Sequence, residues 1–455
     1  MAIADPVIAE DIVPKRHLGL WQATAINMID MVGIGPFITL PMVIGLMNGP
    51  YFLYAWLAGA CLSVIDAMVW SELGAAFPLA GGSYHFLKQA YGNTFPGRLM
   101  SFLFVWQTLI QAPLVVASAS IGFAAYFSYL IPLSPLASHL VSGGAVLCIV
   151  ILLLRRIETI GKISVVLSVV VIGTISWIIG AGIAHGHFTE PIRHLNDGMH
   201  WDHSFVILLG FASVKTVYSY LGYYNVCHLG GDIVHPTKNI PRSMFLSIFG
   251  VTLLYLMMNV SVVSVIPWQQ AKDSPFIISL FMEELAGPAA ARTVTAFVLI
   301  IAFASVFSAT LGYSRVPYAA ARDGAFLKIF ARVHPRDQYP YVSVLFLGGV
   351  AFVFSLFMRL SEVISAILAM RILVQFIGQA VGLLVLHRRG RTNLPYRMPW
   401  YPWPALLAIV MWGGILISTG WTMVLTGLGM MLLGTIVFLL TRRFSAGSPD
   451  VSKPG

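Results

Sequence analysis

The sequence predicts an all-α integral membrane protein with twelve transmembrane helices. Of its 455 residues, 58% are hydrophobic and 10% are charged, whereas a soluble domain carries about 25% charged residues. The mean hydropathy is +0.83, and a water-soluble protein of this length could not bury so much apolar surface. Helices are the only element expected, because lipid offers no partner to unpaired backbone groups and the chain lacks the alternating pattern of a transmembrane barrel.

Windows of about 20 residues, the length that a helix needs to cross the hydrocarbon, locate the spans. They lie near residues 18–47, 51–78, 98–130, 138–154, 163–184, 204–228, 243–266, 293–316, 341–358, 363–386, 402–420 and 422–441. The chain is thereby divided into an N-terminal segment (1–17), a first five-helix repeat (18–184), a loop (185–203), a second five-helix repeat (204–387), a further loop (388–401), two accessory helices (402–441) and a tail (442–455).

The basic residues predict how the chain is oriented. They are spread over short loops and form no stripe with interleaved aromatics, so no nucleic-acid partner is expected. With a cytoplasmic N-terminus, the Lys and Arg residues of the outside loops are Arg193, Lys272, Arg292 and Arg359 alone. The positive-inside rule therefore places both termini in the cytoplasm and loop 185–203 outside, in a multi-pass protein of the cell membrane.

No metal, cofactor or catalytic constellation is expected. The three cysteines, Cys61, Cys148 and Cys227, have neither CxxC spacing nor metal-ligand spacing, which excludes a disulfide framework and a zinc site. HExxH, Walker and nucleophile-elbow motifs are absent. Five histidines crowd the loop before the sixth span, where a solvated polar loop is favoured over a metal site: His185, His187, His194, His200 and His203.

Two of the predicted helices are interrupted. The first is broken at Val32–Pro36, where two glycines and a proline favour leaving the helix, and the sixth is broken more softly at Tyr218–Tyr223. Five spans separate the breaks, so the second copy is inverted in the membrane, which is an architecture of many secondary transporters. A glycine cluster alone would also fit close helix packing. Two breaks at matching places favour a ligand site between them.

Several motifs resemble those of the amino acid/polyamine/organocation superfamily of transporters. Gly33–Phe37 is similar to the family's G-S/T/A-G-x-F break in helix 1. Further similarities occur in the expected order up to about residue 405: Ser71–Gly74 with Phe77–Tyr84, Gly231–Ile233 with Pro236 and Asn239–Arg242, Ser314 and Arg315 with Ala321–Gly324, and Pro395–Arg397 with Pro399. The ordered set is far more specific than any one motif.

The resemblance implies an amino acid transporter that works by alternating access without a cofactor. It assigns substrate binding to the two breaks, at Met31, Gly33, Ile34, Gly35, Tyr218, Leu221 and Gly222. The physics of the breaks agrees, because the free N–H groups of Ile34 and Gly35 lie at the positive end of a half-helix and suit a carboxylate. Released carbonyls of Met31, Tyr218 and Leu221 can accept from an α-ammonium. Tyr218 occupies the place of an aromatic that closes over the substrate from outside; its alternative role is packing in the bundle.

Two departures from the family pattern bear on the substrate. Ile34 replaces a small or hydroxyl residue, so backbone donors alone remain for the carboxylate. Tyr223 and Tyr224 add aromatic content beyond the second break, which favours an apolar or aromatic substrate side chain if they face the site.

The ionisable residues Asp30, Asp66, Lys215 and Arg371 lie within spans, and Glu72 lies near the cytoplasmic end of the second span. An unpaired charge there costs at least about 2.5–3.5 kcal/mol, so each should be paired or face water. Lys215 is a candidate coupling residue that exchanges a proton as the cavity opens. The alternative is a structural ion pair with Asp66 or Asp30. Arg371 is interpreted as a structural partner.

The coupling ion follows from a comparison with the same family. Some sodium-independent relatives carry a lysine in helix 5 that stands in for sodium, and Val171 occupies that place here. Lys215 is the candidate replacement, so transport is expected to be sodium-independent, by proton symport or by exchange. Sodium bound at Ser305 and Ser308 is the alternative.

Two other functions compete with amino acid transport. A polyamine or other organic-cation carrier would need extra acids at the site, and Asp30 is the one acid near the breaks. An integral-membrane enzyme is disfavoured because the buried acids and bases do not cluster with a nucleophile.

Overall fold

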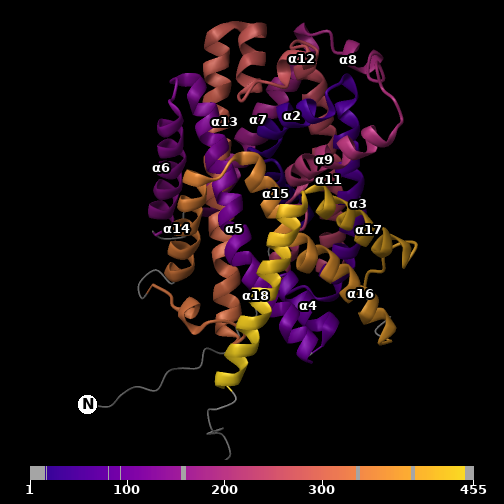
Figure 1. Cartoon of the computed structure of the whole chain (residues 1–455), viewed down its shortest axis with the longest axis vertical. Coiled ribbons are helices and arrows are strands. Elements are labelled where there is room, and N and C mark those ends of the chain that lie inside the picture. Colours follow the sequence, from indigo (N-terminus) through magenta and orange to yellow (C-terminus); the bar gives the residue numbers. More distant parts are fainter. Residues whose placement is uncertain are drawn as a thin grey trace, which may run out of the picture.

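The computed structural model describes residues 16, 18–79, 81–92, 94–154, 160–334, 339–390 and 395–445. These residues form a bundle of helices, most of them running along its long axis (Figure 1). Within the described residues, the one strand-like feature is an isolated bridge between Leu18 and Ile233.

The helices follow one another along the whole chain. The first half contains α1 (Leu20–Met31), α2 (Gly35–Met47), η1 (Pro50–Phe52), α3 (Leu53–Ala76), α4 (Ser83–Tyr91), α5 (Phe95–Leu130), α6 (Pro135–Leu153), α7 (Ile160–His185), α8 (Glu190–Arg193), α9 (His203–Tyr220) and α10 (Asn225–His228). The second half contains η3 (Gly230–Asp232), α11 (Pro236–Val263), α12 (Trp268–Ala271), α13 (Ile277–Arg322), η4 (Lys328–Ala331), α14 (Tyr341–Phe357), α15 (Leu360–Arg371), η5 (Ile372–Ile377), α16 (Gly378–Arg388), α17 (Trp403–Ser418) and α18 (Trp421–Ser445).

Length and hydropathy identify seven helices that can cross a membrane, and an eighth span if the bent pair α1 and α2 is counted as one. Three shorter apolar helices, Val169–His185, Tyr341–Phe357 and Trp403–Ser418, coincide with three further predicted spans. The all-α membrane fold is therefore confirmed. The number of twelve crossings stays a prediction.

The structure also contains helices that the 20-residue window missed. The short helices α4, α8 and α12 lie between the spans, and α13 starts well before the predicted span because it includes a helical stretch that ends at a kink at Gly287. A π-helical segment, η5, follows α15 directly. Windows long enough to find a membrane span average over such short elements and over changes of helix type.

The packing of the helices is the one expected of an inverted repeat. The first span packs on the seventh through α1 and α11, and the sixth packs on the second through α9 and α3. In an inverted repeat with an offset of five spans, the first span corresponds to the sixth and the second to the seventh, so these two contacts are equivalent. The third and eighth spans, α5 and α13, pack along each other and would be exchanged by the same operation. The exact limits of the repeats and loops stay predictions, and residues 1–15, 17 and 446–455 of the terminal segments lie outside the described part of the chain.

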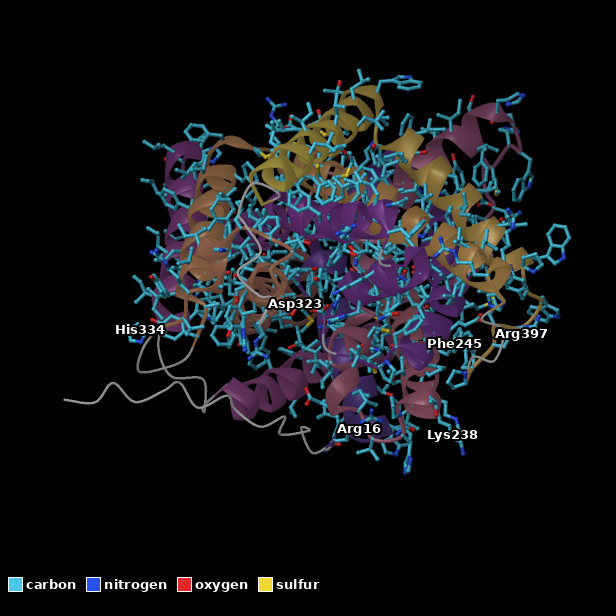
Figure 2. All side chains as sticks on the ribbon, turned by 90° about the horizontal axis from the view of Figure 1, so that it is seen from below. Arg16, Lys238, Phe245, Asp323, His334 and Arg397 are labelled. Carbon is cyan, nitrogen blue, oxygen red and sulfur yellow. The ribbon has the colours of Figure 1, made fainter. Side chains whose placement is uncertain are left out.

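The two ends of the bundle differ. Helices α8 and α12 lie at one end and α4 at the other (Figure 1). An end-on view from below shows Arg16, Lys238 and Arg397 around its rim (Figure 2). These three belong to the segments expected to face the cytoplasm, so the orientation predicted from the charges can be followed on one end of the molecule.

Candidate substrate-binding site

The first predicted break is present. Helix α1 ends at Met31, α2 begins at Gly35, and the two axes differ by 49°. Pro36 lies in the first turn of α2, where its missing N–H leaves no bond unmade. Among the described residues, no backbone hydrogen bond is donated by Gly33, Ile34 or Gly35. These donors lie at the N-terminus of α2, where the helix dipole favours an anion.

The second break lies between Tyr220, the end of α9, and Asn225, the start of α10. Gly222 has φ +122°, a conformation that L side chains rarely adopt. A Cβ there would lie 2.8 Å from the carbonyl carbon of Asp30 and 2.8 Å from the backbone nitrogen of Met31. Glycine is therefore required, because the backbones of the two breaks touch at this point.

Two side chains that sequence reasoning missed hold the breaks together. The hydroxyl of Tyr255, on α11, lies 2.8 Å from the carbonyl oxygen of Met31 and 3.0 Å from that of Ser219. The side-chain oxygen of Asn27, on α1, accepts from the N–H of Val226 at 2.9 Å. Both residues are fully buried, but neither carries a sequence signal, since a tyrosine or an asparagine in a span is also compatible with ordinary packing.

A central cavity of about 90 Å³ lies where the breaks meet. This volume is several times the roughly 10–15 Å³ that a single water requires. The structure brings together all seven residues predicted to bind substrate, since each of them lines this cavity: Met31, Gly33, Ile34, Gly35, Tyr218, Leu221 and Gly222.

Tyr218 reaches across the cavity to α5. Its hydroxyl lies 2.8 Å from Oγ of Ser118. Ser118 donates its own proton to the carbonyl of Val115 at 2.7 Å, so the Tyr218 hydroxyl is the donor of the shared bond. The tyrosine thus links α9 to α5 beside the central cavity, a position that suits an aromatic residue closing over a substrate.

The carbonyls of the breaks are less free than expected. The oxygen of Met31 accepts from Tyr255, and that of Tyr218 accepts from the N–H of Leu221 at 3.3 Å. A carbonyl oxygen has two lone pairs, so each keeps one acceptor direction. The carbonyl of Leu221 accepts no backbone hydrogen bond from another described residue outside the helices.

The alternative role of Lys215, a structural ion pair with Asp66 or Asp30, is not found among the described residues, and its role in coupling stays a prediction. Its Nζ donates to the carbonyl of Ser361 at 2.9 Å and lies 3.3 Å from Oγ of Ser365. Lys215 lines a second cavity of about 360 Å³, together with Glu362 and residues of α2, α17 and α18. The sequence places Lys215 near the break, but its helix face directs it toward α15.

Asp66 likewise has partners other than Lys215. Its carboxylate accepts from the hydroxyl of Tyr223 at 2.5 Å and from the indole N–H of Trp412 at 2.9 Å. It thereby ties α3 to the second break and to α17. Tyr223 is turned to this carboxylate, whereas Tyr224 lines the central cavity.

Arg371, for which the sequence suggests a structural role, lines the central cavity, as does Asp30. Val171, at the place of the helix 5 lysine, and Ser305 line it too. Ser305 packs closely on the first break, since a Cβ on Gly33 would come within 2.5 Å of its Oγ. The side chain of Ser308, named with Ser305 as a sodium candidate, lies outside the described part of the structure.

The histidine-rich loop forms ion pairs. Nδ1 of His194 lies 2.7 Å from Oδ2 of Asp197, and its Nε2 lies 3.3 Å from Oε2 of Glu190. The hydrogen bond and the charge of Asp197 raise the pKa of His194 above its usual value. In the described part of the chain, no three His, Cys, Asp or Glu side chains group as a metal site would need.

A helical membrane bundle in which two broken helices meet at a central cavity has the architecture of a secondary transporter. The model of the amino acid permease family matches residues 18–442. The chain belongs to this family, and the resemblance to the amino acid/polyamine/organocation superfamily is confirmed.

Individual relatives are similar over most of their length. The branched-chain amino acid permease BcaP of Bacillus subtilis is 23% identical, covering 94% of this chain and 93% of the relative. The serine/threonine exchanger SteT of the same bacterium is 23% identical, covering 88% and 90%. The human Asc-type amino acid transporter 1 is 26% identical, covering 77% and 68%. These names describe transporters, in agreement with the prediction that the chain is not an enzyme.

Proposed function

We propose that this protein is a secondary transporter that moves amino acids across the cell membrane by alternating access. The observation that carries the proposal is the junction of the two breaks. Three unpaired N–H groups at the start of α2 face a cavity whose other wall is the break after α9. Relatives named as permeases, exchangers and transporters of amino acids support it.

Each pole of an amino acid has a complement in this cavity. The α-carboxylate binds the N–H groups of Ile34 and Gly35, because they combine free donors with the positive end of the α2 dipole. The α-ammonium binds the remaining acceptor directions of the carbonyls of Met31, Tyr218 and Leu221, and the carboxylate of Asp30 attracts it. Gly33 and Gly222 allow the backbones to approach.

Tyr218 acts as the lid. Its bond to Ser118 closes the cavity against α5, and breaking that bond frees the ring to move with α9. The half-helices then rock around the bound substrate, so that the site opens to one side of the membrane at a time. We also propose that both termini lie in the cytoplasm, because the positive-inside rule favours that orientation.

Transport is proposed to be sodium-independent, by proton symport or by exchange. Val171 is apolar at the place of the helix 5 lysine, so the proton has to be carried elsewhere. Lys215, in the second cavity, and Asp30, in the central one, are the candidates. Arg371 is not a candidate for carrying the proton, since a guanidinium stays protonated in proteins.

A carrier of polyamines or other organic cations is the less favoured function. Among the described residues, those that line the central cavity include one carboxylate, that of Asp30, and one guanidinium, that of Arg371. A substrate with two or more positive charges would be repelled by the guanidinium and would find too few acids.

The test measures uptake into proteoliposomes and thermal stabilisation of the purified full chain with a panel of amino acids and amines. A ligand that binds the folded state raises the melting temperature. Gly35→Leu should abolish uptake with membrane insertion intact. A Cβ there has ordinary contacts of 3.4 Å with Ser219 and Tyr218, but the larger side chain extends into the space of the substrate.

Gly144→Leu is the matched control, because a Cβ on this α6 glycine meets no atom within 4 Å. It should leave uptake unchanged. Wild-type uptake by Gly35→Leu would contradict the assignment of the carboxylate site. Failure of every amino acid in both assays would refute amino acid transport itself.

A further inference from the structure

Arg371 is a buried cation at the central cavity. It is the last residue of α15 and precedes the π-helical segment η5, and it is only 2% exposed. A π-helical turn departs from the regular helical register and is common at functional sites. Here it directly follows Arg371, the arginine that lines the central cavity in the described part of the chain.

Among the described residues, the hydrogen bonds and ring contacts of Arg371 are all with neutral groups. Its Nε donates to Oε1 of Gln375 at 2.9 Å, and one terminal nitrogen donates to the hydroxyl of Tyr313 at 3.1 Å. The guanidinium carbon lies 5.3 Å from the ring centre of Tyr224 and 5.9 Å from that of Phe376. These contacts orient the group, but they do not neutralise its charge.

No described carboxylate forms an ion pair with Arg371. Asp30, which lines the same cavity, attracts it electrostatically, yet none of the ion pairs within 4.0 Å among described residues joins the two. Two of the five N–H donors are used. Burying an unpaired arginine in a membrane costs free energy unless an anion pairs with it. The planar guanidinium can form two parallel hydrogen bonds to one carboxylate.

The charges around the cavity therefore form three poles. The N-terminus of α2 and Arg371 are positive, and Asp30 is negative. An amino acid with an acidic side chain has the inverse pattern of two carboxylates and one ammonium. A neutral amino acid would leave one positive pole without a partner.

We propose that Arg371 binds the side-chain carboxylate of an acidic amino acid substrate, aspartate or glutamate. This inference rests on the proposed function and adds the substrate class to it. It differs from the apolar or aromatic side chain that Tyr223 and Tyr224 suggested in the sequence. Tyr223 faces Asp66, and the ring of Tyr224 supports the guanidinium.

The experiment compares acids with their near-isosteric amides. Aspartate, asparagine, glutamate and glutamine are titrated into the purified full chain, with the melting temperature and competition with labelled substrate as readouts. A hydrogen-bonded charge contributes about 1.5–3 kcal/mol, so the acid should bind about 10- to 150-fold more tightly than its amide. Equal binding of acid and amide by the wild-type protein would overturn the proposal.

Two variants assign the preference to Arg371. Arg371→Gln should bring the ratio of acid to amide affinity close to one. The control Arg359→Gln, at the exposed start of α15, should keep the wild-type ratio. If Arg371→Gln lowers the affinity for acid and amide equally, the guanidinium holds the α-carboxylate, and the proposal is wrong.

Comparing acid and amide binding by the wild-type protein tests the preference for acidic substrates even if Arg371→Gln does not fold. Tyr313→Phe then gives a milder change, because it removes one hydrogen bond to the guanidinium and should reduce the ratio without abolishing it. Transport of neutral amino acids alone would refute the acidic subsite and leave amino acid transport standing. Transport of no amino acid would refute the proposed function first.

Discussion

Lys215 and Arg371 are both buried cations within membrane spans, but they line different cavities. Lys215 donates to a backbone carbonyl and a serine in the second cavity, which Glu362 also lines. Arg371 faces the central cavity, at the junction of the two breaks, with neutral neighbours alone among its hydrogen bonds to described residues. The role of a buried charged residue can therefore be inferred only when the cavity that it lines and its hydrogen-bond partners are known.

The comparison also separates two roles that a cation can have in a transporter. Arginine stays charged and recognises an anion by the geometry of its donors. Lysine can release its proton and so respond to pH. Arg371 accordingly suits substrate recognition, and Lys215 suits coupling. Substitutions at the two cavities can test this division, from the largest expected effect to the smallest.

The largest effect is expected at the contact that builds the central cavity. Gly222→Ala places a Cβ 2.8 Å from the backbone of Asp30 and Met31 at a φ of +122°, and backbone strain of this kind costs about 1–3 kcal/mol. The two breaks have to separate, so uptake should be lost and the melting temperature should fall. Both are measured on the purified protein and in proteoliposomes.

Gly144→Ala, where a Cβ meets nothing within 4 Å, serves as its control. Uptake and melting temperature at the wild-type level in Gly222→Ala would show that the breaks do not depend on this contact.

An intermediate effect is expected at the lid. Tyr218→Phe removes the bond to Ser118, which is worth about 0.5–1.5 kcal/mol, so apparent affinity should fall about 2- to 13-fold. Tyr218→Ala should have a larger effect because the ring that covers the substrate is lost as well. Initial rates of uptake over a range of substrate concentrations measure both variants.

Phe249→Ala is the reference for an aromatic outside the site, since this α11 side chain is 61% exposed and lines neither cavity. If Tyr218→Ala changes uptake no more than Phe249→Ala does, the tyrosine is a packing residue.

The smallest effect is expected at the second cavity. Lys215→Met should keep exchange at one fixed pH within about threefold of the wild type, because the side chain does not line the space of the substrate. The dependence of uptake on pH should flatten, since the ammonium that exchanges a proton is gone. Uptake is followed from acidic to alkaline pH with sodium absent.

Lys272→Met, at a loop lysine that contacts Asn48, should leave the pH profile unchanged. A wild-type profile in Lys215→Met together with an altered one in Asp30→Asn would move the coupling site to the central cavity. Strict dependence on sodium would remove both residues from this role.

Composition and local sequence determined the fold class of this protein and the place of its site. A chain so apolar has to be a helical membrane protein, since lipid provides no partner for backbone groups. The break in the first helix follows from Gly33, Gly35 and Pro36, because these residue types lower the cost of leaving a helix or remove a donor from it. Such effects act within a few residues and can be predicted without knowing the neighbours.

The tertiary structure alone decided which buried charges meet. Asp66 is paired with Trp412, 346 residues away along the chain, and Lys215 with Ser361 rather than with an acid. The π-helical segment after Arg371 shifts the helix register, so regular spacing does not predict the face beyond it. Partners of this kind depend on how whole helices are rotated and packed against each other, and that is fixed by many weak contacts distant in sequence.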